Sequence, residues 1–437
     1  YKRQPQEGED AGKRDKRLGK GKPQLWVIPA HGGEARQVTF AKYGAGDPTW
    51  SPDGTKLLFT ARTGDPPEIP EHNGKREPRS HRITRIMYRF NNAGYIYEQR
   101  THLFVVPAAG GEPTQLTDGD WDDGDAAWSP DGSQIVFGSD RHEDRWYVPR
   151  GEIWLMNADG SNQHAILASD DLEGSHPAWS PDSRQIAFLG SPMWHGGGHS
   201  DVYVMRPGEQ PCNLTMDHFE TFSDAIGSDM RTEHADATPV WRDDGQALFV
   251  LANARGAGNI YQLAVADGAL SPVTTGAHHV LGFSFDDSQN TLALALADVQ
   301  QPGDIFVHWR DSGNTERLTD VNKDLLSEVY VGTPETFQFK GANGWDIEGW
   351  LIKPPNFDPN QRYPMILEIH GGPNTSYGYS FNQEFQILAG KGFVVVYTNP
   401  RGSTSYGREF SKAVSGRWGQ EDYEDLMAGV DTVLGMG

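Results

Sequence analysis

The sequence predicts a β-propeller of six to seven blades, followed by the N-terminal part of an α/β domain. Three observations predict it. A turn phrase recurs along the chain, a hairpin phrase alternates with it, and near Tyr330 both give way to unbroken apolar strands. Among 437 residues, 51 are glycine and 28 are proline, which favours many turns between short strands.

The turn phrase is an aromatic residue, then Ser-Pro-Asp-Gly or a variant, then an alternating apolar run. Proline sets φ for the second position of a type I turn, and glycine takes the left-handed exit. The preceding tryptophan is large enough to pack between neighbouring sheets. Five copies occur at irregular intervals, at residues 50–60, 128–138, 179–189, 241–251 and 283–294.

The hairpin phrase is a strand, a tight turn and a second strand that ends in Leu-Thr or a similar pair. Six copies occur, at residues 25–39, 102–117, 152–167, 201–215, 259–274 and 304–319. One hairpin phrase with one turn phrase makes about four short strands, which is one propeller blade. We therefore assign residues 25–329 to the propeller, because such units close into rings more readily than they stack into a solenoid.

The first hairpin phrase has no turn phrase before it. Residues 1–24 are thus either an incomplete N-terminal blade or a flexible basic loop. The second alternative is favoured by eight basic and four acidic residues in residues 1–22, with hardly any large apolar side chains.

Residues 330–437 have a different pattern. Residues 335–340 and 347–353 read as an antiparallel pair, residues 365–369 and 393–397 as fully apolar strands, and residues 381–389 and 422–434 as helices. Strand, helix, strand, helix with apolar strands predicts a parallel sheet covered on both faces. Two parallel strands alone leave an unpaired edge, so we expect further polypeptide after Gly437.

Composition excludes several classes of partner. With 38 basic and 60 acidic residues the net charge is −22, which argues against nucleic acid and anionic membrane surfaces. No apolar stretch approaches the roughly 20 residues that span a bilayer. Cys212 is the single cysteine, so no disulfide forms within the chain, and we expect a cytoplasmic protein.

One motif stands where open α/β sheets bind their ligands, at the carboxyl end of a predicted parallel strand. It is His370-Gly371-Gly372-Pro373. Two glycines there let backbone N–H groups face a substrate oxygen, as an oxyanion hole for acyl transfer requires, although a plain tight turn is the alternative. The Gly-x-Ser-x-Gly nucleophile motif is absent, and no Ser-His-Asp triad can be assembled from this chain.

Four features together resemble the prolyl oligopeptidase family of serine peptidases, and most closely its acylaminoacyl-peptidase branch. They are the Trp-Ser-Pro-Asp-Gly repeats and the segments Leu367-Glu-Ile-His-Gly-Gly-Pro373, Asn399-Pro-Arg-Gly-Ser-Thr-Ser-Tyr-Gly407 and Trp418-Gly-Gln-Glu-Asp-Tyr-Glu-Asp-Leu426. The resemblance implies a β-propeller that is seven-bladed in the whole protein. In addition, it implies that residues 330–437 begin an α/β-hydrolase domain whose triad lies outside this chain. It also implies an oxyanion donor at Gly372 or Gly371, with Gly372 preferred.

The resemblance further implies a serine peptidase that releases acylated amino acids or cleaves short peptides, with the propeller filtering substrates by size. The expected partners are short or N-acylated peptides and the remainder of the hydrolase domain. A second copy of the chain, in a homo-oligomer, is a further alternative. Two alternatives remain: a non-catalytic propeller that binds protein partners, and a dipeptidyl peptidase of the same family.

Five residues are candidates for substrate contact. Four lie in a long interruption of the repeats, residues 62–100, which is either a packed loop between blades or a loop that binds the substrate's blocked end or carbonyl groups. The fifth is an arginine that either bonds backbone carbonyls around the site or touches substrate. The five are Arg85, Tyr88, Arg89, Phe90 and Arg401.

We expect no metal and no cofactor. The glycine run between His195 and His199 is too flexible to fix two imidazoles on a zinc ion. Four aspartates are spaced as in a calcium-binding loop. However, glycine stands at the seventh rather than the sixth position of such a loop, and Ser129 occupies the last position, where an acidic residue is needed. These aspartates are Asp118, Asp120, Asp122 and Asp125.

Overall fold

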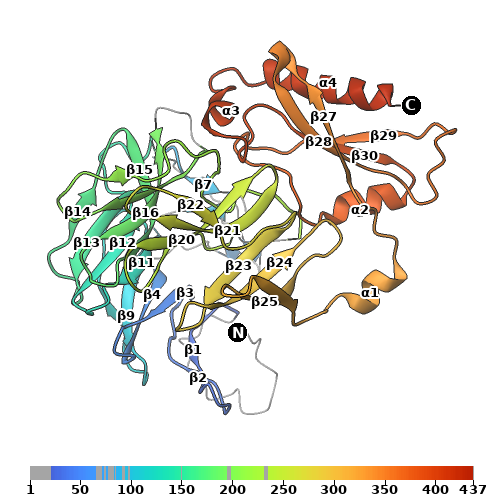
Figure 1. Ribbon diagram of the computed structural model, residues 1–437. Coiled ribbons are helices and arrows are strands. Elements are labelled where there is room, and N and C mark those ends of the chain that lie inside the picture. Colours follow the sequence, from blue (N-terminus) through green and yellow to red (C-terminus); the bar gives the residue numbers. More distant parts are fainter. Residues whose placement is uncertain are drawn as a thin grey trace. The chain divides into compact units, whose positions relative to one another are not determined.

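The computed structural model describes residues 21–64, 71–72, 75–76, 83, 85–90, 94–96, 99–148, 150–193, 198–230 and 235–436. The prediction for residues 1–20 therefore lies outside the described residues. The chain divides into two compact units, Tyr1–Ile186 with Arg206–Glu209 and Ala187–Met205 with Gln210–Gly437. Figure 1 labels their helices and strands. No helix in the described part of the chain is long and apolar enough to cross a membrane.

The first unit consists of antiparallel sheets. A two-stranded sheet, β1-β2, precedes two four-stranded sheets with the orders β10-β9-β4-β3 and β11-β12-β13-β14. Each four-stranded sheet joins one turn phrase to one hairpin phrase, which confirms the predicted repeat unit. The strands are β1 (Trp26–Val27), β2 (Arg36–Gln37), β3 (Ala45–Trp50), β4 (Lys56–Thr63), β9 (Arg100–Pro107), β10 (Thr114–Gln115), β11 (Asp123–Trp128), β12 (Gln134–Ser139), β13 (Glu152–Asn157), β14 (His164–Leu167) and β15 (Leu172–Trp179).

The long interruption is an insertion within one sheet. β4 pairs directly with β9, from Lys56 opposite Pro107 to Thr63 opposite Arg100. The inserted segment carries two short hairpins of its own, β5 (Glu71–His72) with β6 (Lys75–Arg76), and β7 (Arg89–Phe90) with β8 (Gly94–Tyr95).

The second unit begins within β16 and continues with the hairpin of β17 and β18 and two further four-stranded antiparallel sheets. Their orders are β19-β20-β21-β22 and β23-β24-β25-β26. The strands are β16 (Ile186–Pro192), β17 (Asp201–Met205), β18 (Cys212–Asn213), β19 (Val240–Trp241), β20 (Ala247–Ala254), β21 (Ala257–Ala264), β22 (Leu270–Pro272), β23 (His279–Phe285), β24 (Thr291–Ala297), β25 (Asp304–Trp309) and β26 (Asn314–Arg317).

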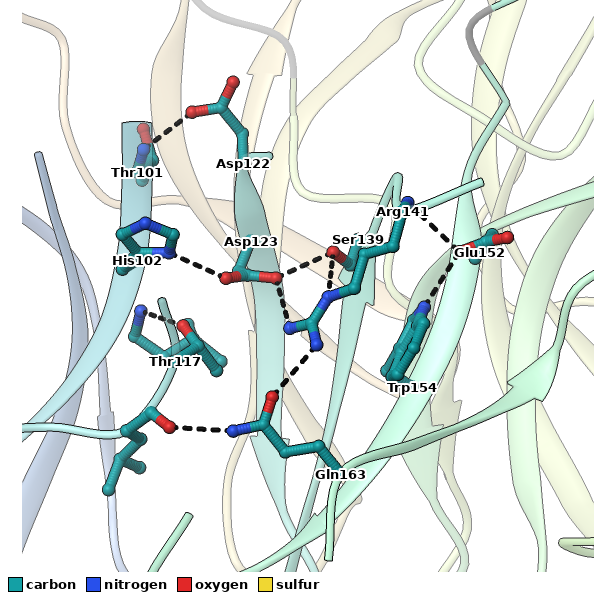
Figure 2. Close-up of polar contacts among 12 residues, drawn as sticks. Thr101, His102, Thr117, Asp122, Asp123, Ser139, Arg141, Glu152, Trp154 and Gln163 are labelled. Atoms are coloured by element: carbon teal, nitrogen blue, oxygen red, sulfur yellow. Dashed lines mark hydrogen bonds and ion pairs between the residues drawn. The ribbon is translucent and has the colours of Figure 1, made fainter. Parts of the chain in front are cut away.

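The threonine that closes the hairpin phrase has a structural role. In five of the six hairpins its hydroxyl accepts a hydrogen bond from the backbone N–H near the start of the hairpin, as Thr117 does from Leu103 at 3.0 Å (Figure 2). The sixth hairpin has Leu167 at this place. A buried N–H is costly without a partner, so this hydroxyl explains why the phrase ends in threonine.

The turn phrase is held by its serine and aspartate. Ser51 donates its hydroxyl to Asp53 at 2.7 Å and accepts the N–H of Lys56 at 2.9 Å, and Ser129 and Ser180 make the corresponding bonds. The bond from Ser51, with further bonds from Thr55, lowers the pKa of Asp53 to about 2. These contacts pin the turn in the geometry that the sequence predicts.

The tryptophans of the turn phrase pack as predicted in three of four cases. Trp128 lies in one core cluster with Leu58 and Leu103 of the adjacent sheet, and Trp179 and Trp241 are equally buried. For Trp50 the prediction is wrong, since this side chain is 49% exposed. The sheet before Trp50 has only two strands of two residues, too small a surface to cover an indole ring.

The C-terminal sheet has the order β27-β28-β30-β29, and β29 and β30 are parallel, as predicted. One face packs Leu351 and Val396 with Phe410, and the other packs Trp350 and Tyr397 with Phe385. The sheet is thus covered on both faces. The elements are α1 (Lys323–Glu328), β27 (Glu335–Lys340), the short helix Ala342–Gly344, β28 (Asp346–Ile352), β29 (Met365–Glu368), α2 (Gln383–Gly390), β30 (Val394–Asn399), α3 (Arg408–Lys412) and α4 (Glu421–Gly435).

Candidate active site

Two loops leave the carboxyl ends of the parallel strands β29 and β30. The first carries residues 370–376 and the second residues 400–407. Because parallel neighbours end at the same edge of a sheet, the loops meet there. Thr404 donates its N–H to the carbonyl of Thr375 at 3.0 Å, and the hydroxyls of Ser376 and Ser405 lie 3.1 Å apart.

His370 joins the two loops. Its Nδ1 lies 2.9 Å from the carbonyl oxygen of Gly371, and its Nε2 lies 3.0 Å from the hydroxyl of Ser403. Burial lowers the pKa of His370, although hydrogen bonds with Gly371 and Asn399 oppose this effect. A carbonyl oxygen only accepts, so Nδ1 carries the hydrogen that is donated to Gly371, while Nε2 contacts a hydroxyl whose own hydrogen is donated to the carbonyl of Pro400 at 2.7 Å. The neutral ring holds the start of the first loop rather than carrying charge.

The two glycines of the turn differ. Gly372 has φ +125°, and a Cβ there would lie 2.5 Å from the backbone nitrogen of Asn374, so only glycine fits. Gly371 has ordinary φ and open space around the Cβ position. Both are exposed, and no described residue accepts a hydrogen bond from either N–H. The turn thus presents two backbone donors.

Arg401 is engaged by a buried carboxylate. Its Nε and one terminal nitrogen lie 2.8 and 2.9 Å from the two oxygens of Asp425, and it also donates to the carbonyl of Glu421. Both side chains are buried, and the bond to Asp425 raises the pKa of Arg401. Asp425 additionally accepts the N–H of Arg401 and of Ala342. The pair ties the second loop to α4.

A cavity of about 420 Å³ adjoins the first loop. Its lining is Pro373, Asn374, Ser411, Val414, Ser415, Gly416 and Trp418. Asn374 donates its side-chain amide to the carbonyls of Gly402 at 3.1 Å and Ser411 at 3.3 Å, which binds the first loop to the second loop and to α3.

The same loops contact the repeat sheets of the second unit. Gly227 donates to the carbonyl of Ser376 at 2.8 Å, and Ser405 donates its N–H to the hydroxyl of Thr221 at 3.1 Å. Arg408, the first residue of α3, lies 2.6 Å from Asp201, with side chains 12% and 0% exposed. Repeat strands and the C-terminal sheet therefore share one polar interface within this unit.

The four other predicted substrate contacts lie in the first unit. The guanidinium of Arg85 pairs with Asp120 at 2.8 Å and stacks on Trp146, with 4.5 Å to the ring centroid. Arg89 lies 5.6 Å from the ring of Tyr95. Tyr88 is exposed, and the backbone of Phe90 pairs with Gly94. The rings of Tyr88 and Tyr95 lie 6.1 Å apart, so Tyr88, Arg89 and Tyr95 are neighbours, while Arg85 has separate partners.

The acidic and histidine clusters have other partners. Asp120 pairs with Arg85 and Arg100, and Asp122 accepts the N–H of Thr101 at 2.6 Å. His199 lies 3.4 Å from the hydroxyl of Thr221, while His195 lies outside the described residues. In the part of the chain that the structure describes, no group of three His, Cys, Asp or Glu side chains is arranged to hold a metal ion.

Sequence reasoning did not assign roles to several residues at this site. Asp425 and Ser403 stand within the quoted C-terminal motifs, but the pairing of Arg401 with Asp425 and of His370 with Ser403 spans residues far apart in sequence. Asn374 and Arg408 were not singled out. An asparagine directly after a Gly-Gly-Pro turn is a local signal that could have pointed to Asn374, because its amide can bond nearby backbone carbonyls.

Comparison with known proteins connects this site to a family. Residues 379–437 match the sequence profile of the prolyl oligopeptidase family. An uncharacterized peptidase, YuxL, of Bacillus subtilis is 30% identical over 417 residues, which cover 94% of this chain and 63% of the relative. Dipeptidyl-peptidase 5 of Porphyromonas gingivalis is 26% identical over 408 residues, which cover 87% of this chain and 56% of the relative.

Solved structures show the same fold. The acylaminoacyl peptidase of Pyrococcus horikoshii matches with a TM-score of 0.72 and 23% identity, over 94% of this chain and 60% of that chain. The chain thus spans less than two thirds of the length of each of these relatives. Together the matches confirm the resemblance to the prolyl oligopeptidase family that the sequence predicts.

Proposed function

We propose that this chain supplies the propeller and the first part of the catalytic domain of a serine peptidase of the prolyl oligopeptidase family. The whole protein would release acylated amino acids or cleave short peptides. The observation that carries the proposal is the turn at Gly372, which presents backbone N–H donors at the carboxyl end of a parallel strand, next to the segment that matches the family.

In this proposal the N–H of Gly372, with Gly371 as the alternative, is one donor of an oxyanion hole. Attack of a serine on an acyl carbon places negative charge on the carbonyl oxygen, and a fixed N–H stabilises that charge. The second donor would be the N–H of the residue after the nucleophile. The serine, aspartate and histidine of the triad would come from polypeptide outside these 437 residues.

We assign residues 25–329 to a propeller, seven-bladed in the whole protein, and residues 330–437 to the peptidase domain. Four-stranded antiparallel sheets that repeat the same two phrases support the first assignment. A sheet with parallel strands and helices on both faces supports the second. The propeller would admit short or blocked peptides and exclude folded proteins.

A first experiment tests the oxyanion donor. Gly372→Ala keeps the N–H but places a Cβ 2.5 Å from the nitrogen of Asn374, which displaces the donor. We expect kcat toward a short peptide to fall by about 10²-fold or more, the usual effect when one oxyanion donor no longer acts. Gly392→Ala is the control, because Gly392 also has positive φ (+98°) but open space around its Cβ position. Equal kcat for the two variants would contradict the role of Gly372.

A second experiment separates the candidate activities. A fluorophosphonate probe should label the whole protein, and the hydrolysis of an N-acetylated amino-acid amide is compared with that of a dipeptide amide with a free amine. Preference for the acetylated substrate supports an acylaminoacyl peptidase. Preference for the free amine supports the alternative, which the similarity to a dipeptidyl-peptidase 5 favours. No labelling and no hydrolysis would favour a binding propeller.

We also propose that the segment with Arg85, Tyr88, Arg89 and Phe90 contacts substrate, whereas Arg401 acts through its buried pair with Asp425. Arg89 gives the clearest test, since its guanidinium contacts an exposed ring and pairs with no carboxylate of the described residues. Arg89→Ala is expected to raise KM for an N-acetylated substrate several-fold with little change in kcat. An unchanged KM would end this part of the proposal.

A further inference from the structure

A glycine of the repeat region lies directly against the turn that carries the proposed oxyanion donors. A Cβ built on Gly198 would lie 2.2 Å from the Cβ of Asn374 and 2.3 Å from its Cγ. Real Cβ atoms do not approach so closely, so Asn374 can occupy its place only because residue 198 has no side chain. Both residues belong to the second unit.

The side chain of Asn374 is fixed by two hydrogen bonds. Its amide donates to the carbonyls of Gly402 and Ser411, at 3.1 and 3.3 Å. Only Pro373 stands between Asn374 and Gly372 in the chain, and its ring restricts the backbone there. A displacement of Asn374 would therefore be transmitted to the N–H of Gly372.

We propose that Asn374 and Gly198 are positioning residues for the oxyanion turn: the amide of Asn374 anchors the turn to the second loop and α3, and Gly198 closes over Asn374 from the repeat region. This inference rests on the proposed peptidase function. It gives the repeat region a part in aligning the catalytic groups, beyond filtering substrates. Misplacement of a catalytic group by about 1 Å can cost about 100-fold in rate, so a displaced Asn374 is expected to lower kcat.

The first test is Gly198→Ala in the whole protein, with Gly208→Ala as its matched control. The two glycines have nearly equal φ, +83° and +87°, but no atom lies within 4 Å of a Cβ on Gly208. Both variants bear the same left-handed backbone cost, and only Gly198→Ala drives a methyl group into Asn374. We expect kcat to fall about 10-fold or more for Gly198→Ala, with KM nearly unchanged, and to stay within about twofold for Gly208→Ala.

The second test is Asn374→Asp, which keeps the shape of the side chain and removes its donors. A carboxylate facing two carbonyl oxygens is repelled, so we expect a loss of kcat comparable with that of Gly198→Ala. Amide hydrogen exchange of the peptide that covers residues 370–376 is measured for every variant. Faster exchange is expected for Gly198→Ala and Asn374→Asp but not for Gly208→Ala.

These readouts separate two failures. If the wild-type protein hydrolyses no peptide but exchange still rises in the two variants, the peptidase proposal fails while the support of the turn stands. If exchange and kcat in Gly198→Ala and Asn374→Asp equal those of Gly208→Ala, the positioning role is overturned.

Discussion

Asp425 shows how a single buried charge depends on its partner. Its side chain is fully buried and accepts two bonds from the guanidinium of Arg401. Asp425→Asn would leave Arg401 without its buried ion-pair partner, a change that destabilises proteins by about 3–5 kcal/mol. Urea unfolding measures the change. Asp431→Asn, an exposed aspartate on the same helix, should stay within about 0.5 kcal/mol, and similar values for both variants would contradict the importance of the pair.

The neutral imidazole of His370 makes stability depend on pH. Burial lowers its pKa in the folded protein, so between the ordinary histidine value, about 6.5, and the folded value the unfolded chain binds more protons. The contribution of the neutral ring to the free energy of unfolding is therefore complete above about pH 6.5, and it declines as the pH falls below that value. Free energies of unfolding at pH 7.5 and pH 5 should differ less in His370→Gln than in the wild type. Equal differences would show that His370 does not titrate in this way.

At the scale of elements, the closing threonine of each hairpin is expected to carry measurable stability. Thr117→Val keeps the shape but removes the acceptor for the buried N–H of Leu103, which should cost about 1–3 kcal/mol. Thr117→Ser retains the hydroxyl and should lose much less. Thermal unfolding of the two variants provides the comparison, and a valine variant as stable as the serine variant would show that the bond contributes nothing.

The repeat elements could be predicted because their signals are local. A serine-aspartate turn and a hairpin closed by threonine satisfy their own backbone groups within about 15 residues, so the sequence alone places strands such as β4 and β9. α3 was not predicted, because its five residues give too short a pattern. The exposure of Trp50 depends on the size of the sheet beside it, which the turn phrase does not encode.

The sequence predicted the backbone N–H donors of the candidate site but not the side chains that hold them in place. A Gly-Gly turn after an apolar strand marks a position for N–H donors, so Gly371 and Gly372 could be found from local spacing. The partners that fix the turn could not be found in this way. Ser403 and Gly198 reach the turn through tertiary packing, across 33 and more than 150 residues of sequence. Local sequence patterns do not show which residues meet over such separations.

At the scale of the whole molecule, one buried ion pair connects repeat strands to the C-terminal sheet. Asp201 opens β17 and is bound by Arg408 of α3, by Asn213 and by Thr215. Burial raises the pKa of Asp201, but hydrogen bonds from His199 and Arg408 outweigh this effect and the pKa is lowered. The ion pair thus contributes its full stabilisation above the ordinary pKa of aspartate, about 3.9. This stabilisation is lost as the pH falls through the lower pKa of the folded protein.

Removing the cation of this pair should uncouple the two parts that it joins. Arg408→Met leaves Asp201 buried without its counter-charge, so we expect a loss of about 3–5 kcal/mol, and Asp201→Asn in the same protein should restore part of it. Lys412→Met on the same helix is the control, because Lys412 pairs with the exposed Glu409 alone among the described contacts. Hydrogen exchange in increasing urea should show β17 and β30 losing protection together in the wild type and in Lys412→Met. In Arg408→Met the two strands should lose protection at different urea concentrations, and a common transition in all three proteins would mean that the interface is held without this pair.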